Sequence, residues 1–176
     1  MNIKLLSLDP SFRNWGFVIA EYDAVNHLLH IHSGGVLSSK PDKSNTKQNT
    51  KDLKVSCYLY KHLIQLTKDI DIVIAEVPHG SQSSRAMVSY GVCIALLGCI
   101  QQPLIQISAM DVKRLVGSNT ASKDDVINWV KQHYQLDWLP KAKSKSEHIC
   151  DAIAALHIGI QSKQFKEYYE TITNNS

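Results

Sequence analysis

Three acidic residues occupy positions where a carboxylate would be costly to bury. Asp9 ends the apolar run LSLD just before Pro10, and Glu76 ends a second run, IVIAE, two residues before Pro78. Asp151 lies within the largely apolar segment HICDAIAALHIGI. A carboxylate removed from water is destabilising unless it is paired or bound to a metal. The pattern therefore predicts that these side chains share a partner.

Hydrolysis of a phosphodiester is the chemistry that such a group of acids suits. Carboxylates held a few ångströms apart raise one another's pKa unless a cation intervenes. Dense oxygen ligands suit Mg²⁺ or Mn²⁺, and two such ions about 4 Å apart can activate water and stabilise a leaving oxygen. Spacing alone does not show that the acids meet. Asp9 in a simple Asp-Pro turn and Asp151 as an exposed helical residue are the alternatives.

The elements that must position these acids follow from hydrophobic patterning. Short apolar or alternating runs predict strands, and 3.6-residue periodicity with capping residues predicts helices. The expected strands are residues 3–8, 15–22, 27–37, 71–78 and 103–108, with a bulge at Gly34-Gly35. The expected helices are residues 53–68, about 83–100, 110–117, one capped by Ser122 with Asp125, and 146–160. We expect residues 39–52 to form a loop.

These elements predict an α/β fold with a mixed sheet of about five strands flanked by helices. Ligand sites in open α/β sheets lie beyond the carboxyl ends of the strands. Parallel neighbouring strands would therefore present Asp9 and Glu76 together. On the last helix Glu147 and His148 both share a face with Asp151, at spacings of four and three residues.

Composition indicates one soluble domain over residues 1–176. The chain is 44% hydrophobic and 20% charged, with no signal peptide and no membrane-spanning run. We therefore expect a cytoplasmic protein with no membrane partner. The four cysteines form no CxxC pair, which favours reduced packing thiols over a zinc or disulfide framework. They are Cys57, Cys93, Cys99 and Cys150.

The positive charge is concentrated in two stretches, although the formal net charge is only +3. Residues 39–54 carry five lysines against Asp42 and Asp52, and residues 141–148 add three more. Such stretches are either solvated loops or cationic arms for a phosphate backbone. We expect a basic loop at about 39–54 and a short C-terminal tail from about residue 162.

The order of elements and acids resembles the RNase H-like superfamily and, within it, the RuvC-type Holliday junction resolvases. LSLDPSFRNWGFVIAE is similar to the first-strand motif, in which Asp-Pro-Gly leads to a glycine seven residues after the aspartate. Asp9 and Gly16 match these positions, and Ser11 replaces the middle glycine. IVIAEVP resembles the second motif, which carries Glu76.

Two further segments extend the resemblance to about residue 160. HICDAIAALHIGI is similar to the closing acidic helix, whose pattern of Asp or His, two residues, then Asp-Ala gives His148 and Asp151. DVKRLVGSNTASKDDV resembles the stretch with two DNA-contacting lysines, here Lys113 and Lys123.

The resemblance implies a Mg²⁺-dependent crossover junction endodeoxyribonuclease that acts in DNA recombination and repair. It assigns the catalytic and metal-ligating roles to Asp9, Glu76, His148 and Asp151, with two Mg²⁺ ions for which Mn²⁺ can substitute. Glu147 competes with His148 as the fourth ligand. The expected DNA contacts are Lys113, Lys123, His79 and Arg85.

Its substrate would be four-way DNA, which a homodimer cuts in two matched strands. The apolar helix 86–100 provides a possible dimer surface, with burial inside the monomer as the alternative. Rival functions are cleavage of flaps, hybrids or other branched DNA by the same fold, and junction binding without catalysis. His79 stands near the place where bacterial members carry an aromatic wedge. Together with the lysine stretch, this departure indicates a phage or plasmid relative in a bacterial or phage-infected cell.

Overall fold

The computed structural model describes residues 2–40, 43–80 and 83–174. One five-stranded sheet runs through it in the order β3-β2-β1-β4-β5. β1, β2 and β3 are antiparallel, whereas β4 and β5 continue from β1 in parallel. The strands are β1 (Asn2–Asp9), β2 (Asn14–Asp23), β3 (Leu28–Ser38), β4 (Ile72–Glu76) and β5 (Leu104–Ile107). The predicted mixed sheet is thus confirmed.

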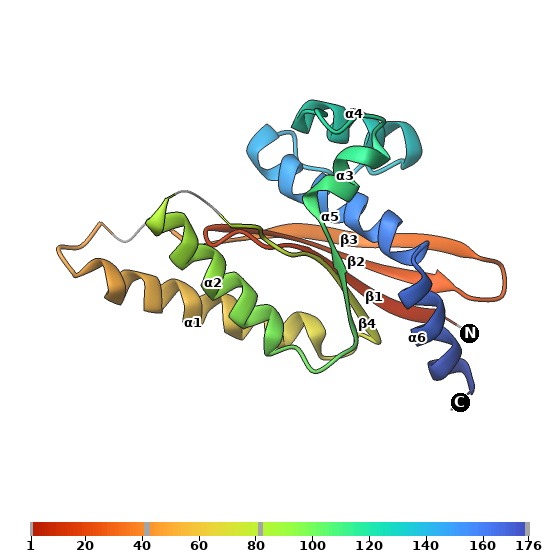
Figure 1. The fold of residues 1–176 in the computed structure, drawn as a ribbon, viewed down its shortest axis with the longest axis horizontal. Helices are drawn as coiled ribbons and strands as arrows, with labels where there is room; N and C mark the ends of the chain where they lie inside the picture. Colours follow the sequence, from red (N-terminus) through yellow and green to blue (C-terminus); the bar gives the residue numbers. More distant parts are fainter. Residues whose placement is uncertain (1, 41–42, 81–82, 175–176) are drawn as a thin grey trace.

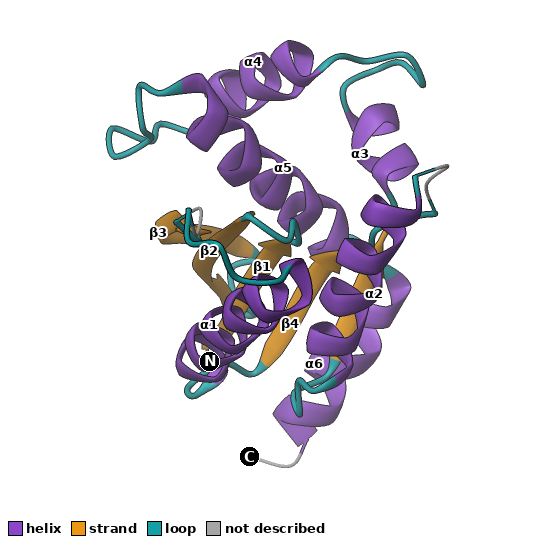
Figure 2. Ribbon diagram, turned by 90° about the vertical axis from the view of Figure 1, so that its left-hand side faces the viewer, coloured by secondary structure: helices purple, strands orange, loops and turns teal. Residues whose placement is uncertain are grey.

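Helices cover both faces of this sheet (Figure 1 and Figure 2). α1 and α2 pack on one face, while α5 crosses the other and contacts all five strands. α3, α4 and α6 pack against α5. The helices are α1 (Gln48–Thr67), α2 (Ser84–Gly98), α3 (Ala109–Leu115), α4 (Lys123–His133), α5 (Lys143–Ile160) and α6 (Lys163–Asn174).

Alternation along β1 decides which of its side chains face α5. Ile3 and Leu5 belong to the core beneath α5, whereas Leu6 and Leu8 belong to the core beneath α1 and α2. Successive side chains of a strand point to opposite faces. Asp9 therefore extends from β1 on the face that carries α5.

Two glycines allow α5 to lie directly on the sheet. A Cβ added to Gly16 of β2 would overlap the backbone carbonyl group of His148 in α5. A Cβ added to Gly159 would lie 2.7 Å from Cγ2 of Ile74 in β4. Between them, the buried hydroxyl of Ser7 donates a hydrogen bond of 2.7 Å to the Ala152 carbonyl. The height and position of α5 over the sheet are therefore fixed at several points.

The Gly34-Gly35 pair is not the bulge that the sequence predicted. The register between β2 and β3 shifts at Ile19/Ala20, so His32 is the extra residue. The glycines instead leave room for two aromatic rings. A Cβ on Gly34 would lie 2.8 Å from Trp138, and one on Gly35 would lie 3.0 Å from the Phe17 ring.

Three element boundaries also differ from expectation. α1 begins at Gln48, inside the predicted loop, because Asp52 accepts hydrogen bonds from Gln48 and from Arg85 of α2. α5 begins at Lys143 rather than residue 146. Residues 163–174, predicted only as a tail, form α6, whose Phe165 is buried in the core. Residues 41–42 of the predicted basic loop and residues 175–176 lie outside the described residues.

The predicted helix ends are confirmed where a cap marks them. Ser83 caps α2, and Ser122 with Asp125 forms a capping box on α4. Gly117, which follows α3, has φ +97°, a conformation that glycine adopts without strain. All four cysteines are free, although Cys57 and Cys99 are exposed rather than packed inside. No helix in the described part of the chain is both long enough and apolar enough to span a membrane.

Candidate active site

The sheet brings Asp9 and Glu76 to the same edge. β1 and β4 are parallel neighbours, with Leu8 paired to Ala75 in the last register position. Asp9 and Glu76 are the next residues of their strands and end them. Their expected juxtaposition at the carboxyl ends of two parallel strands is confirmed.

Helix α5 adds His148 and Asp151 above this edge. The Nδ1 atom of His148 lies 2.6 Å from Oδ2 of Asp9, and both side chains are largely buried. Lys123 of α4 approaches from the opposite side, with Nζ 3.9 Å from Oδ2 of Asp151 and 3.5 Å from Oε2 of Glu147. Of the two alternatives for a fourth ligand, His148 faces Asp9, whereas Glu147 faces Lys123.

Burial and mutual repulsion make two of the carboxyl groups unusually weak acids. Burial and, after it, the charges of Asp9 and Asp151 raise the pKa of Glu76 to about 7. Burial also raises the pKa of Asp151 to about 7, with Asp9 as the next cause, although Lys123 and His148 oppose the rise. The three acids therefore act on one another electrostatically.

This electrostatic cost predicts that the metal-free protein is more stable in mild acid. Glu76 has a higher pKa folded, about 7, than its ordinary value of 4.5, so the folded state binds the proton more tightly. The resulting stability is complete below about pH 4.5 and is lost as the pH rises through about 7. At pH 8 without divalent ions, Glu76→Gln should therefore raise stability by about 1–2 kcal/mol. Thermal unfolding should show this as a rise in Tm of about 3–6 °C.

The same comparison at pH 5.5 provides the control. Glu76 is itself largely neutral there, so the difference between the wild type and Glu76→Gln should shrink. Adding Mn²⁺ at pH 8 should raise the Tm of the wild type more than that of the variant, because a ligand stabilises the state that binds it. Equal Tm values at pH 8 would show that Glu76 carries no electrostatic strain.

A groove of about 810 Å³ opens beside Asp9 and Glu76. One wall is the β1–β2 turn, residues 10–14, and the other is the first half of α2. His79 and Arg85, two of the expected DNA contacts, line this groove. The other two, Lys113 and Lys123, line a smaller cavity of about 140 Å³ that contains Glu76 and Asp151. All four expected DNA contacts thus border the carboxylates.

Arg85 nevertheless has a partner within the protein. Its two terminal nitrogens pair with the two carboxylate oxygens of Asp52 in α1. This bidentate arrangement is the strong form of an arginine ion pair. The guanidinium group that was expected to meet DNA therefore connects α2 to α1.

The donor set fits a divalent cation, although its present arrangement is not a closed metal site. Three carboxylates supply the oxygen ligands that Mg²⁺ and Mn²⁺ prefer, and the imidazole of His148 lies beside one of them. Among residues 2–40, 43–80 and 83–174, however, no three His, Cys, Asp or Glu side chains converge in metal-binding geometry. His148 and Lys123 contact oxygens of Asp9 and Asp151, so these oxygens would have to turn toward an ion.

Sequence reasoning missed two residues that shape the site. Ser7 is a fully buried hydroxyl in an apolar strand, two residues before Asp9 and on the same face. Its polarity in that position was a usable signal. Asp52 gave no comparable signal, because its partner Arg85 is 33 residues away in the sequence.

Comparison with known proteins gives similarity only at the level of structure. No family model matches the sequence, and no curated protein matches it either. RuvC of Thermus thermophilus in complex with a Holliday junction substrate superposes with a TM-score of 0.66 at 17% identity, over 87% of this chain and 90% of that one. A second structure of Thermus thermophilus RuvC superposes with a TM-score of 0.60 at 16% identity, over 98% of this chain and 97% of that one.

A viral protein shares the same architecture. The fowlpox virus Holliday junction resolvase superposes with a TM-score of 0.52 at 17% identity, over 92% of this chain and 98% of that one. The coverage is nearly complete on both sides. The chain has the RNase H-like fold of the RuvC-type resolvases.

Proposed function

We propose that the protein is a structure-selective endonuclease that resolves four-way DNA junctions by paired, divalent-metal-dependent hydrolysis. The observation that carries this proposal is the arrangement of the acids: Asp9 and Glu76 line the large groove, Asp151 lines the smaller cavity that also contains Glu76, and His148 is bonded to Asp9. Similarity to resolvase structures, including one in complex with a Holliday junction substrate, supports the choice of substrate.

In this proposal the four residues hold two Mg²⁺ or Mn²⁺ ions. Asp9, Glu76 and Asp151 would supply the carboxylate ligands, with His148 beside Asp9. The bound ions supply a water of lowered pKa and neutralise charge on the reacting phosphate. The contact of 2.6 Å between Nδ1 of His148 and Oδ2 of Asp9 places the imidazole beside this carboxylate.

Cationic side chains next to the acids offset the repulsion between these carboxylates and a phosphate. A phosphate would be repelled by three carboxylates unless positive groups lay beside them. Lys113 and Lys123 line the cavity next to Glu76 and Asp151, and both oppose the rise in the pKa of Glu76. We assign them to the phosphate beside the scissile bond. His79 lies in the larger groove, where its ring can stack on an unpaired base.

Resolution of a junction needs two active sites related by symmetry, and α2 offers a surface for that dimer. Its outer side exposes Met87, Val88 and Ile94, although helices normally bury such residues. Gly91 and Gly98 lie on the same helix, and a Cβ on either would meet no described atom within 4 Å. Glycine in a helix interior costs about 1 kcal/mol relative to alanine. We therefore infer that a second copy packs closely against α2.

A cleavage assay with defined substrates tests the proposal. The full chain would be incubated with Mg²⁺ or Mn²⁺ and a synthetic four-way junction, a flap, an RNA–DNA hybrid or a linear duplex. We expect symmetrically paired nicks in the junction and slow cutting of the linear duplex. Preferential cutting of flaps or hybrids would contradict resolution and support the rival nuclease function. Sedimentation in the same buffer should show a dimer, and paired incision by a monomer would contradict the assignment of α2.

A further inference from the structure

The lysine-rich stretch that follows β3 is attached to the groove at both ends. At its start, the backbone N–H of Ser39 donates to the carbonyl oxygen of Arg13, at 3.1 Å. At its end, Asp52 in α1 pairs with Arg85 in α2. Arg13 and Arg85 line opposite walls of the 810 Å³ groove. The described residues at both ends of this stretch are therefore attached to residues that line the groove.

Three lysines in the described part of this stretch form what we call the lysine rim: Lys43, Lys47 and Lys51. Lys43 and Lys47 are exposed, and Lys51 is half-buried. Lys47 precedes the first turn of α1 and Lys51 follows four residues later, so these two share a side of the helix. The rim thus presents positive charge on the segment between the two attachments.

The Asp52–Arg85 ion pair, which we call the clasp, also occupies the acid that directly follows Lys51 in the sequence. Asp52 is the one acidic residue between positions 43 and 54. Its side chain is 14% exposed, it accepts a further hydrogen bond from Gln48 at 2.9 Å, and its pKa is lowered by the Arg85 hydrogen bond. The carboxylate is thus directed to the arginine and the amide, and the rim lysines keep their charge for an external anion.

We propose that the lysine rim binds the phosphate backbone of a duplex arm leaving the catalytic groove, and that the Asp52–Arg85 clasp holds the rim there. Arg85 then acts on DNA indirectly, as a positioning residue for α1. The partner follows from the proposed function, on which this inference rests, and from the repeated negative charge that a duplex offers to spaced lysines.

The clasp leads to an unusual prediction about the direction in which one substitution changes the affinity for DNA. Asp52→Asn removes a negative charge near the DNA, which by simple electrostatics should tighten binding. If Asp52 instead holds the rim in place, the same change should weaken junction binding by about 5-fold and reduce the magnitude of the salt slope by about 1, as for the loss of a phosphate contact. Tighter binding would therefore indicate simple electrostatics, whereas weaker binding would indicate that Asp52 positions the rim.

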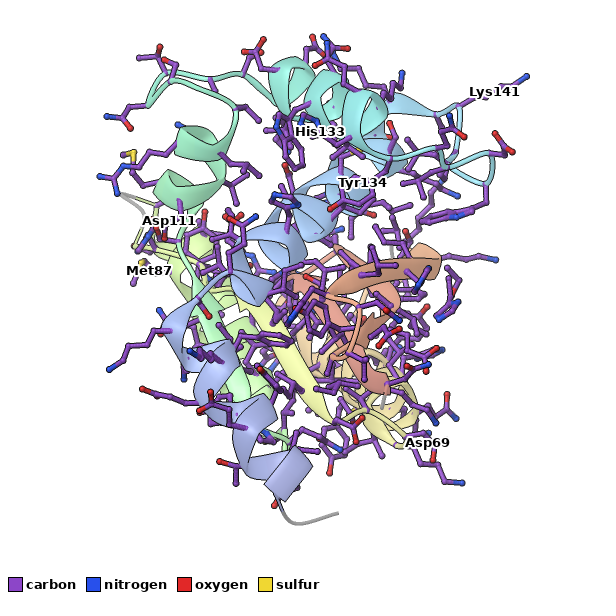
Figure 3. All side chains as sticks on the ribbon, turned by 90° about the vertical axis from the view of Figure 1, so that its right-hand side faces the viewer. Asp69, Met87, Asp111, His133, Tyr134 and Lys141 are labelled. Carbon is purple, nitrogen blue, oxygen red and sulfur yellow. The ribbon has the colours of Figure 1, made fainter. Side chains whose placement is uncertain are left out.

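Fluorescence anisotropy of the full chain with a labelled four-way junction and a linear duplex, in Ca²⁺ and at several salt concentrations, measures this difference. Asp69→Asn is the matched control, because it removes the same charge just beyond the other end of α1. Figure 3 shows Asp69 far from Met87, which lies two residues from Arg85. This control should bind at least as tightly as the wild type. The charge swap Asp52→Arg with Arg85→Asp should restore affinity and salt slope.

Circular dichroism should show that all variants keep the overall fold, since neither Asp52 nor Arg85 belongs to the hydrophobic core. If Asp52→Asn binds both DNAs as tightly as the wild type or more tightly, the Asp52–Arg85 pair does not position the rim for DNA. A wild type that binds the linear duplex without favouring junctions would contradict the proposed function, while the contrast between Asp52→Asn and Asp69→Asn on that duplex would still test the rim. A wild type that binds neither DNA would overturn both.

Discussion

Replacing Asp9 with asparagine should abolish junction cleavage and leave junction binding intact. Asparagine has nearly the same shape and can still hydrogen-bond to Nδ1 of His148, now 2.6 Å from Asp9. It lacks the charge that a divalent ion requires, so we expect cleavage to fall by more than about 100-fold, beyond the usual effect of losing a group that merely supports a metal ligand. Single-turnover cleavage and anisotropy, on the same junction, measure the two effects separately.

The matched substitution Asp69→Asn should cut at the wild-type rate, because Asp69 lies away from the groove. An Asp9→Asn variant that still cuts in Mg²⁺ would remove Asp9 from the catalytic group. Loss of binding together with loss of cutting would show that Asp9 maintains the fold of the groove. Cleavage that survives in Mn²⁺ alone would reassign Asp9 to ion selection.

Replacing Gly16 with alanine should damage both the fold and the site. The added methyl group would overlap the backbone of His148, which has no rotamer with which to move aside. α5 would therefore have to lift from β2, at a cost of about 2 kcal/mol, seen as a fall in Tm of about 4–8 °C. Because His148 and Asp151 move with α5, we expect cleavage to fall by at least about 10-fold at a temperature where the variant is folded.

Gly159→Ala provides the comparison for this prediction. The nearest atoms there belong to the Ile74 side chain rather than to backbone, so a smaller adjustment relieves the contact. This variant should lose less stability than Gly16→Ala and retain more activity, since Gly159 lies about three helical turns from His148. Equal losses in the two variants would show that α5 responds as a rigid rod without a specific contact at Gly16.

The acids at the strand ends were predictable because the relevant forces are local. An apolar run that ends in a single acid before a proline places that acid at the edge of a sheet, and parallel pairing then aligns Asp9 with Glu76. The face of α5 followed from helical spacing in the same way. The choice between His148 and Glu147 did not follow, because both share a side with Asp151 and only packing directs one toward Asp9.

The missed features depend on contacts between distant parts of the chain. The first turn of α1 is polar and lacks apolar periodicity, and it is stabilised by the pairing of Asp52 with Arg85. α6 is a different case. Phe165, Tyr168, Tyr169 and Ile172 follow helical spacing and pack with the core, so the pattern itself predicts a helix there.

The position of α5 across all five strands has a consequence during synthesis. The sheet is encoded by residues 2–107, whereas α5 begins only at Lys143. Domains generally fold as units, so the sheet that carries Asp9 and Glu76 lacks the helix that covers one of its faces until His148 and Asp151 have been translated. An unfinished polypeptide that lacks α5 therefore carries only two of the four proposed ligands, and the proposed cleavage of DNA would require this late helix.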